Sequence, residues 1–87
     1  MKTINYMGQE YELYKVYFTW RECTTVQEGI LLHAVSDEFC DGDTLYGNEW
    51  TLDQINDESD LETLLNSGSD GTTHFHKAFD GTYHMDD

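Results

Sequence analysis

Two histidines and two cysteines are the side chains of this chain best suited to hold a transition metal. His74 and His76 are two residues apart, so on a β-strand their imidazoles lie on one face and can share an ion. Cys23 and Cys40 can complete a Cys₂His₂ set, which is a closed tetrahedral site typical of structural zinc. The sequence therefore predicts a structural zinc site formed by Cys23, Cys40, His74 and His76.

The same residues also fit a metal-free interpretation. The cysteines lack the C-x₂-C spacing of zinc ribbons, and they could simply be small buried residues beside histidines on an exposed edge. A two-residue turn at Asp80-Gly81 would place Met85 opposite His76 and His84 on the other face of the hairpin. By that register, His84 is a weaker candidate ligand than His74.

The middle of the chain carries carboxylates without neighbouring cations. From Glu22 to His76 there are thirteen Asp or Glu residues and no Lys or Arg, and the net charge of the chain is −14. Self-repulsion of this size is hard to explain by solubility alone, although an acidic domain that merely stays soluble is the alternative. Spaced carboxylates can present to a basic protein the negative charge that a nucleic-acid backbone presents. The predicted contact residues are Asp37, Glu38, Asp41, Asp43, Glu49, Asp53, Asp57, Glu58, Asp60 and Glu62.

Several function classes are disfavoured by composition. Four Lys or Arg against eighteen Asp or Glu oppose direct binding of DNA or RNA. The chain has no nucleophile elbow, P-loop, dinucleotide fingerprint or H-E-x-x-H motif, so we expect no enzyme. The acidic segments do not match the calcium-binding loop of EF-hands. Without an apolar run of about 18 residues or a signal peptide, we expect a cytoplasmic protein that does not enter membranes.

The first elements expected to position these side chains are strands. Residues 4–7 and 10–20 flank a Gly8-Gln9 turn signal and predict a hairpin. Along the second strand, Tyr11 and Leu13 are out of phase with the apolar residues that follow, which predicts a bulge or a strong twist near residues 13–14. Residues 24–36 fit a helix or a strand, and their short apolar run favours a third strand.

An acidic loop and a helical segment are expected next. Residues 37–48 carry turn chemistry without periodicity and predict a loop. Residues 51–66 contain two candidate capping boxes, beginning at Thr51 and Ser59, and predict one broken helix or two short helices in series. Carboxylates three or four residues apart on this helix should repel, by about 0.2–0.5 kcal/mol for each pair.

The C-terminal part completes the expected fold. Residues 72–79 predict a strand, and Asp80-Gly81 predicts a hairpin with a type I′ turn. The whole chain of 87 residues should be one α+β domain, with an antiparallel sheet of four or five strands and one helical segment packed on it.

In profile, the chain resembles a group of phage and mobile-element proteins. Its small size, strong acidity and predicted hairpin, opening Met-Lys-Thr-Ile-Asn-Tyr at residues 1–6, are similar to anti-CRISPR and anti-restriction inhibitors, especially acidic inhibitors of type II CRISPR nucleases. The resemblance implies an inhibitor in the host cytosol that docks onto a nuclease and blocks nucleic-acid loading, and some members of the wider group bind zinc. The alternative function is a small zinc-stabilised protein-interaction module without inhibitory activity.

Overall fold

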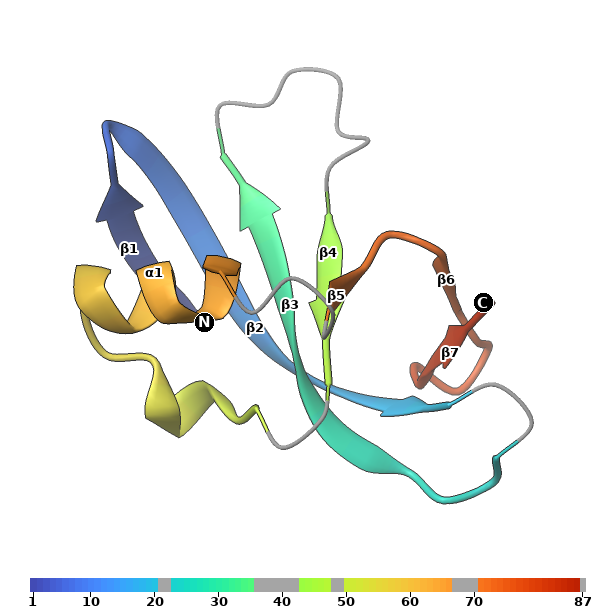
Figure 1. The fold of residues 1–87 in the computed structure, drawn as a ribbon. Coiled ribbons are helices and arrows are strands. Elements are labelled where there is room, and N and C mark those ends of the chain that lie inside the picture. The colour runs from blue at the N-terminus through green and yellow to red at the C-terminus, as the bar shows by residue number, and fades with distance from the viewer. Residues whose placement is uncertain (21–22, 36–42, 48–49, 67–70, 87) are drawn as a thin grey trace.

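A computed structural model describes residues 1–20, 23–35, 43–47, 50–66 and 71–86. Within these ranges the chain forms seven strands, one 3₁₀ helix and one α-helix, so the predicted α+β class is confirmed (Figure 1). In chain order the elements are β1 Lys2–Tyr6, β2 Gln9–Thr19, β3 Gln27–Ala34, β4 Thr44–Tyr46, η1 Leu52–Gln54, α1 Glu58–Asn66, β5 Gly71–Thr72, β6 Phe75–Lys77 and β7 Tyr83–Met85.

The sheet is larger than predicted, and it is mixed. The strands lie in the order β5-β4-β3-β2-β7-β6, and β1 also pairs with β2. All of these pairs are antiparallel except β2 with β7, where Phe18 lies opposite Tyr83 and Thr19 opposite His84. The predicted antiparallel sheet of four or five strands is therefore wrong. No local turn signals the parallel pairing, because β2 and β7 come from opposite ends of the chain.

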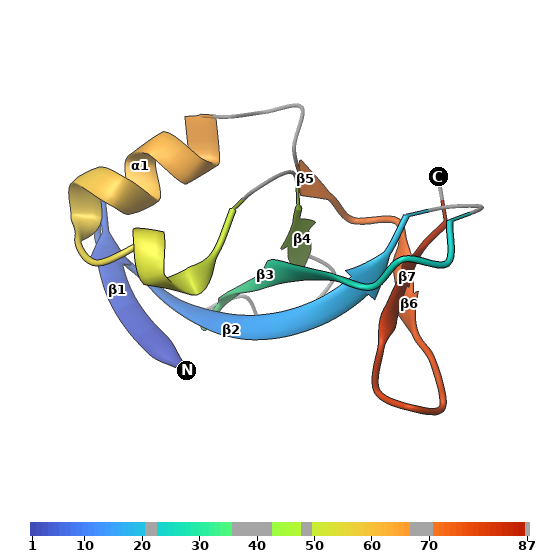
Figure 2. The same ribbon diagram turned by 90° about the horizontal axis from the view of Figure 1, so that it is seen from below.

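Strand β2 is the long, curved spine of the fold, and it buries different faces at its two ends (Figure 2). Leu13 points to the side of the sheet covered by α1, whereas Phe18 belongs to a second apolar cluster with Met85 of β7. The pairing of β2 with β1 and β3 is continuous in register, so the predicted bulge is wrong. The change of buried face explains the phase slip in the sequence.

The larger core cluster lies between the sheet and the helical segment. Its buried members are Leu13, Ile30, Leu32, Tyr46, Ile55, Leu61 and Leu64. Two short helices in series, η1 and α1, cover this cluster. Of the two alternatives predicted for residues 51–66, the two short helices are confirmed and the single broken helix is not. Lys2 of β1 fastens the segment to the sheet, because its Nζ donates to Leu52 O and Ile55 O, both at 2.8 Å.

The type I′ turn occurs in the N-terminal hairpin and not in the C-terminal hairpin, where it was predicted. Met7 and Gly8 both have positive φ, 51° and 80°, as a type I′ turn requires, so this turn lies one residue earlier than the Gly8-Gln9 signal. At the other hairpin Gly81 has φ 90°, but Asp80 is not among the described residues with positive φ. Because Lys77 pairs with Tyr83, the loop spans residues 78–82, and the predicted two-residue turn is wrong.

Other predicted elements are confirmed or corrected locally. The third strand is confirmed as β3. The predicted loop 37–48 contains β4, whose Leu45 and Tyr46 are buried, while residues 37–42 and 48 lie outside the described residues. The predicted strand 72–79 is divided between β5 and β6. In the described part of the chain, no helix has the length and apolarity needed to cross a membrane.

Candidate functional site

Five carboxylates lie on the segment formed by η1 and α1, and we call them the acidic helical surface: Asp53, Asp57, Glu58, Asp60 and Glu62. All are exposed except Asp60, which is partly buried. Within the described ranges, none of the five makes an ion pair. None of the three described lysines pairs with these carboxylates. Lys2 donates to backbone carbonyls of the same segment, Lys15 pairs with Glu28, and Lys77 lies over the Tyr83 ring.

Two of these carboxylates hold the helix start in place. Asp57 Oδ1 accepts the backbone N–H of Asp60 at 2.9 Å, which makes Asp57 the N-terminal cap of α1 in place of the predicted Ser59. Asp60 Oδ2 accepts the backbone N–H of Asn56 at 3.0 Å. Negative charge at a helix N-terminus is stabilising, so Asp57 and Asp60 also support the helix, in addition to the mutual repulsion expected from the sequence. Asp53, Glu58 and Glu62 are exposed and do not cap the helix.

The field of the acidic helical surface reaches the neighbouring strand. Burial, followed by the charges of Glu62 and Glu58, raises the pKa of Tyr6 on β1 above its usual value of 10.0. A carboxylate raises the pKa of a phenol only when its negative charge lies close enough to disfavour the phenolate. Strand β1 and helix α1 therefore share one negatively polarised region.

The structure does not unite all ten predicted contact residues. Asp43 lies in a groove lined by β2, β3 and the C-terminal hairpin, away from the five on the helical segment. Asp37, Glu38, Asp41 and Glu49 lie outside the described residues. The predicted acidic face is thus described for the helical segment alone.

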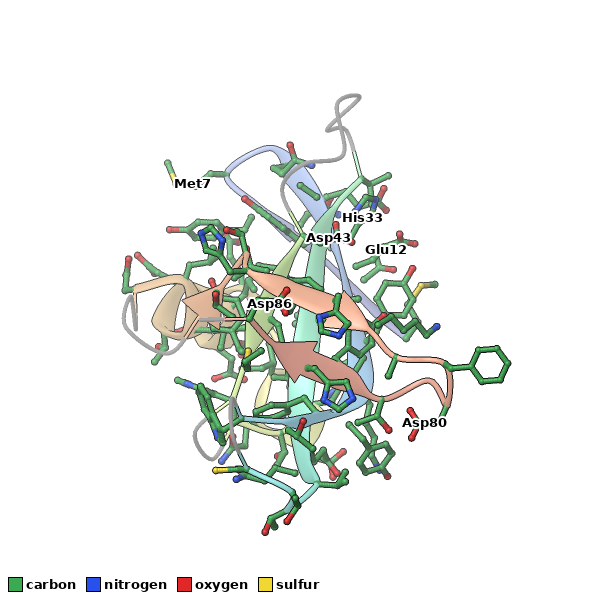
Figure 3. All side chains as sticks on the ribbon, turned by 90° about the vertical axis from the view of Figure 1, so that its right-hand side faces the viewer. Met7, Glu12, His33, Asp43, Asp80 and Asp86 are labelled. Atoms are coloured by element: carbon green, nitrogen blue, oxygen red, sulfur yellow. The ribbon has the colours of Figure 1, made fainter. Side chains whose placement is uncertain are left out.

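The groove has a volume of about 610 Å³, and Figure 3 shows His33, Asp43 and Glu12 near one another above the hairpin. Its lining residues are Glu12, Tyr14, Lys15, Val16, Tyr17, Leu31, His33, Asp43, Lys77, Gly81 and Tyr83. Sequence reasoning missed it because the groove depends on the parallel pairing of β2 with β7, which sets the hairpin against the sheet.

The groove is lined by charges of both signs. His33 Nδ1 and Asp43 Oδ1 are 2.6 Å apart, and the Tyr14 hydroxyl donates to Glu12 Oε1 at 3.1 Å. Burial, the hydrogen bond to Glu12 and its charge, and then the charge of Asp43, raise the pKa of Tyr14. Lysines Lys15 and Lys77 also line the groove. The groove is therefore close to neutral, unlike the acidic helical surface.

The predicted zinc ligands are not brought together in the part of the structure that is described. Cys23 is exposed and Cys40 lies outside the described residues. No three His, Cys, Asp or Glu side chains gather there as a metal site would require. His76 contacts Asp86, with 2.6 Å between Nδ1 and Oδ1.

The register of the C-terminal hairpin also reverses the expectation for His84. His76 lies directly opposite His84, and their rings stack with centroids 5.4 Å apart. His84 Nδ1 is 2.7 Å from Thr19 Oγ1 on β2. The five-residue loop, in place of a two-residue turn, shifts the pairing by one position and moves His84 to the same face as His76.

Comparison with known proteins gives no further guide, because no family model, curated protein or solved structure matches this chain.

Proposed function

We propose that this protein is an acidic inhibitor that binds a basic, nucleic-acid-binding surface of a nuclease, in the manner of anti-CRISPR proteins that block nucleic-acid loading. The acidic helical surface is the contact region. The observation that supports this assignment is that its five carboxylates make no ion pair among the described residues. The partner's Arg and Lys residues would supply the missing cations.

The helical segment suits this role because it holds its charge rigidly. Leu61 and Leu64 are fully buried against the sheet, and Lys2 fixes η1 at its carboxyl end. Charges held in fixed positions need no ordering when the partner arrives, so less entropy is lost on binding. Long-range attraction between the acidic surface and a basic cleft also speeds association and makes it sensitive to salt.

The test is inhibition of DNA cleavage by purified, guide-loaded and guide-free type II CRISPR nucleases. The variant replaces Asp53→Asn, Glu58→Gln and Glu62→Gln, because these three side chains are exposed and do not cap α1. We expect the unmodified protein to inhibit most strongly when it is added before the nucleic acid. The triple variant should associate more slowly by about tenfold or more, and inhibition should weaken as salt rises.

A matched control removes the same amount of charge elsewhere, with Glu10→Gln, Asp80→Asn and Asp86→Asn. All three positions are exposed, and none lies on η1 or α1. If the control impairs inhibition as much as the helical variant, net charge alone is responsible and the proposed contact region is wrong. Absence of inhibition across a panel of type II nucleases, with normal folding of the protein, would reject the function.

Zinc binding is a separate proposal, and it does not depend on the acidic helical surface. Elemental analysis of untagged protein, prepared without chelator, should find about one zinc per chain if Cys23, Cys40, His74 and His76 form the predicted site. The pair His74→Ala and His76→Ala should then remove the metal and lower the melting temperature. Metal-free protein of unchanged stability would eliminate zinc and leave the proposed inhibitor unaffected.

A further inference from the structure

The C-terminal hairpin and α1 lie on opposite sides of β2 (Figure 2). The hairpin joins the sheet through the short parallel pairing of β7 with β2 and then projects away from it. Sheet and hairpin together form an angle, and the groove occupies its inner side. This concave side is distinct from the acidic helical surface.

The tip of the hairpin presents a large apolar side chain to solvent. Phe79 has a relative exposure of 111%, the highest among the exposed large hydrophobic residues of the described chain. The loop that carries it is well ordered by hydrogen bonds, from Ala78 N to Thr82 O at 2.7 Å, from Gly81 N to Ala78 O at 3.0 Å, and from Thr82 N to Asp80 Oδ1 at 2.9 Å. A phenyl ring held outward on a fixed loop is suited to insertion into an apolar recess.

The groove offers such a recess. Tyr14, Val16 and Leu31 form its apolar part. Glu12 and Asp43 carry negative charge in it, and Lys77 on the hairpin carries positive charge. The chain thus carries an apolar projection, a recess and charges of both signs on its concave side.

We propose that the concave side binds a second copy of this chain in a two-fold symmetric dimer. Phe79 of each copy enters the groove of the other, over Tyr14, Val16 and Leu31, and Lys77 of each copy faces Glu12 and Asp43 of the other. Two angular shapes related by a two-fold axis interlock, because each hairpin then lies over the far end of the opposite groove. The same rotation makes the contact between Lys77 and the two carboxylates occur twice, and such an isologous contact closes at two subunits.

A second copy fits the charge of the groove better than the basic partner of the acidic helical surface does. Lys77 would repel a basic surface, whereas it complements the carboxylates of an identical groove. Each chain carries a net charge of −14, so the chains repel one another at long range. Salt screens that repulsion more than it screens the short, enclosed pairs of the contact. Dimerisation should therefore strengthen as salt rises, opposite to the salt dependence of nuclease binding.

The experiment is sedimentation equilibrium of the intact protein at chain concentrations from roughly 1 μM to 1 mM, in salt from about 50 mM to 0.5 M. We expect a monomer–dimer equilibrium whose dissociation constant falls as salt is added. Phe79→Ser should raise that constant by about tenfold or more. Lys77→Glu should weaken the dimer, and the charge exchange of Lys77→Glu with Glu12→Lys should restore it.

Met7→Asn is the matched control. Met7 is also a large apolar residue at a hairpin tip, with an exposure of 81%, but it does not line the groove. Asparagine tolerates its positive φ, so the turn should persist and the dimer should be unchanged. A monomer under every condition, a dimer unaffected by Phe79→Ser, or equal weakening by both tip variants would overturn the proposal. Thermal melting of each variant checks that the monomer is folded.

Discussion

The two sides of the sheet treat charge differently. On the helical side, carboxylates are held by backbone N–H groups or directed to solvent, as Asp57 and Glu58 illustrate. On the hairpin side, ionisable groups of opposite type face one another, as in the pairs His33 with Asp43 and His76 with Asp86. The charges of the described residues are therefore not spread evenly over the surface.

The two proposals therefore assign different modes of binding to the two sides of one sheet. The helical side offers uncompensated charge, which acts over a distance and favours fast association with a basic surface. The hairpin side offers a groove, an exposed aromatic ring and balanced charge, which act only at contact. Variants that alter one side should leave the other unchanged if the two sides are independent.

The largest expected effect comes from Phe18→Ala. Phe18 is fully buried in the cluster that joins β2 to β7, and its ring lies 5.3 Å from that of Trp20 at an interplanar angle of 80°. Loss of the ring should reduce the free energy of unfolding by about 3–5 kcal/mol and loosen the hairpin first. Urea denaturation measures the loss, and Val26→Ala, at an exposed position, should change stability by less than about 0.5 kcal/mol. Hydrogen exchange that increases equally in α1 and β7 would show that the two sides form one cooperative unit.

Lys2→Met tests how the helical side is attached. Lys2 Nζ also lies 3.0 Å from Asn56 Oδ1, in addition to its two carbonyl acceptors at the end of η1. Loss of these charged hydrogen bonds should reduce the unfolding free energy by about 1–2 kcal/mol. The control is Lys15→Met on β2, which removes a single exposed ion pair with Glu28 at 3.4 Å, with an expected change of about 0–1 kcal/mol. Equal losses in urea denaturation would contradict the difference that we describe.

Asp57→Ala separates the carboxylates that support the helix from those that only carry charge. Removing this N-terminal cap should lower stability by about 1 kcal/mol, whereas Glu62→Gln should be within about 0.5 kcal/mol of the parent protein. Thermal denaturation followed by far-ultraviolet circular dichroism distinguishes the two outcomes. A larger loss for Glu62→Gln would mean that its interaction with Tyr6 is more important to the fold than the cap.

Local patterns in the sequence predicted the N-terminal hairpin, the third strand and the two helices in series, because neighbouring residues determine them. The acidic residues of the helical segment were predicted in the same way, since they are contiguous along the chain. By contrast, β4 is only three residues long and lies in a segment rich in turn residues. The composition of that segment therefore predicts a loop and gives no sign of a strand. The choice of Asp57 over Ser59 as cap depends on where Ile55 and Leu61 are buried, which is a tertiary effect.

The groove could not be predicted for a different reason. It requires Phe18 and Tyr83 to pair in parallel, and a contact between distant strands leaves no signal at a fixed spacing. Leu31 and His33 are two residues apart and share a face of β3, but their spacing does not show that Asp43 lies beside His33. The zinc prediction has a related limit, because the spacing of His74 and His76 shows that they can share a strand and not which other segments meet them.

The smallest effects are those of pH, and they should have opposite signs on the two sides. On the hairpin side, the backbone N–H of Thr82, with further contributions from the Thr82 side chain, lowers the pKa of Asp80 below 3.8. Its stabilising contribution is therefore complete above pH 3.8 and is lost as pH falls through the lowered pKa. On the helical side, burial and then the charges of Glu62 and Glu58 raise the pKa of Tyr6 above 10.0. Its contribution is complete below pH 10.0 and is lost as pH rises through the raised pKa.

Two conservative variants test this opposition. Asp80→Asn should flatten the acid limb of a stability profile measured by urea denaturation, and Tyr6→Phe should flatten its alkaline limb. Each variant should leave the other limb unchanged, because Asp80 and Tyr6 belong to opposite sides of the sheet. Tyr46 provides a check on the alkaline limb, since burial raises its pKa as well and Tyr46→Phe should act in the same direction. If Asp80→Asn altered the alkaline limb, the charge of the hairpin would influence Tyr6 across the sheet, and the two sides could no longer be treated as electrostatically separate.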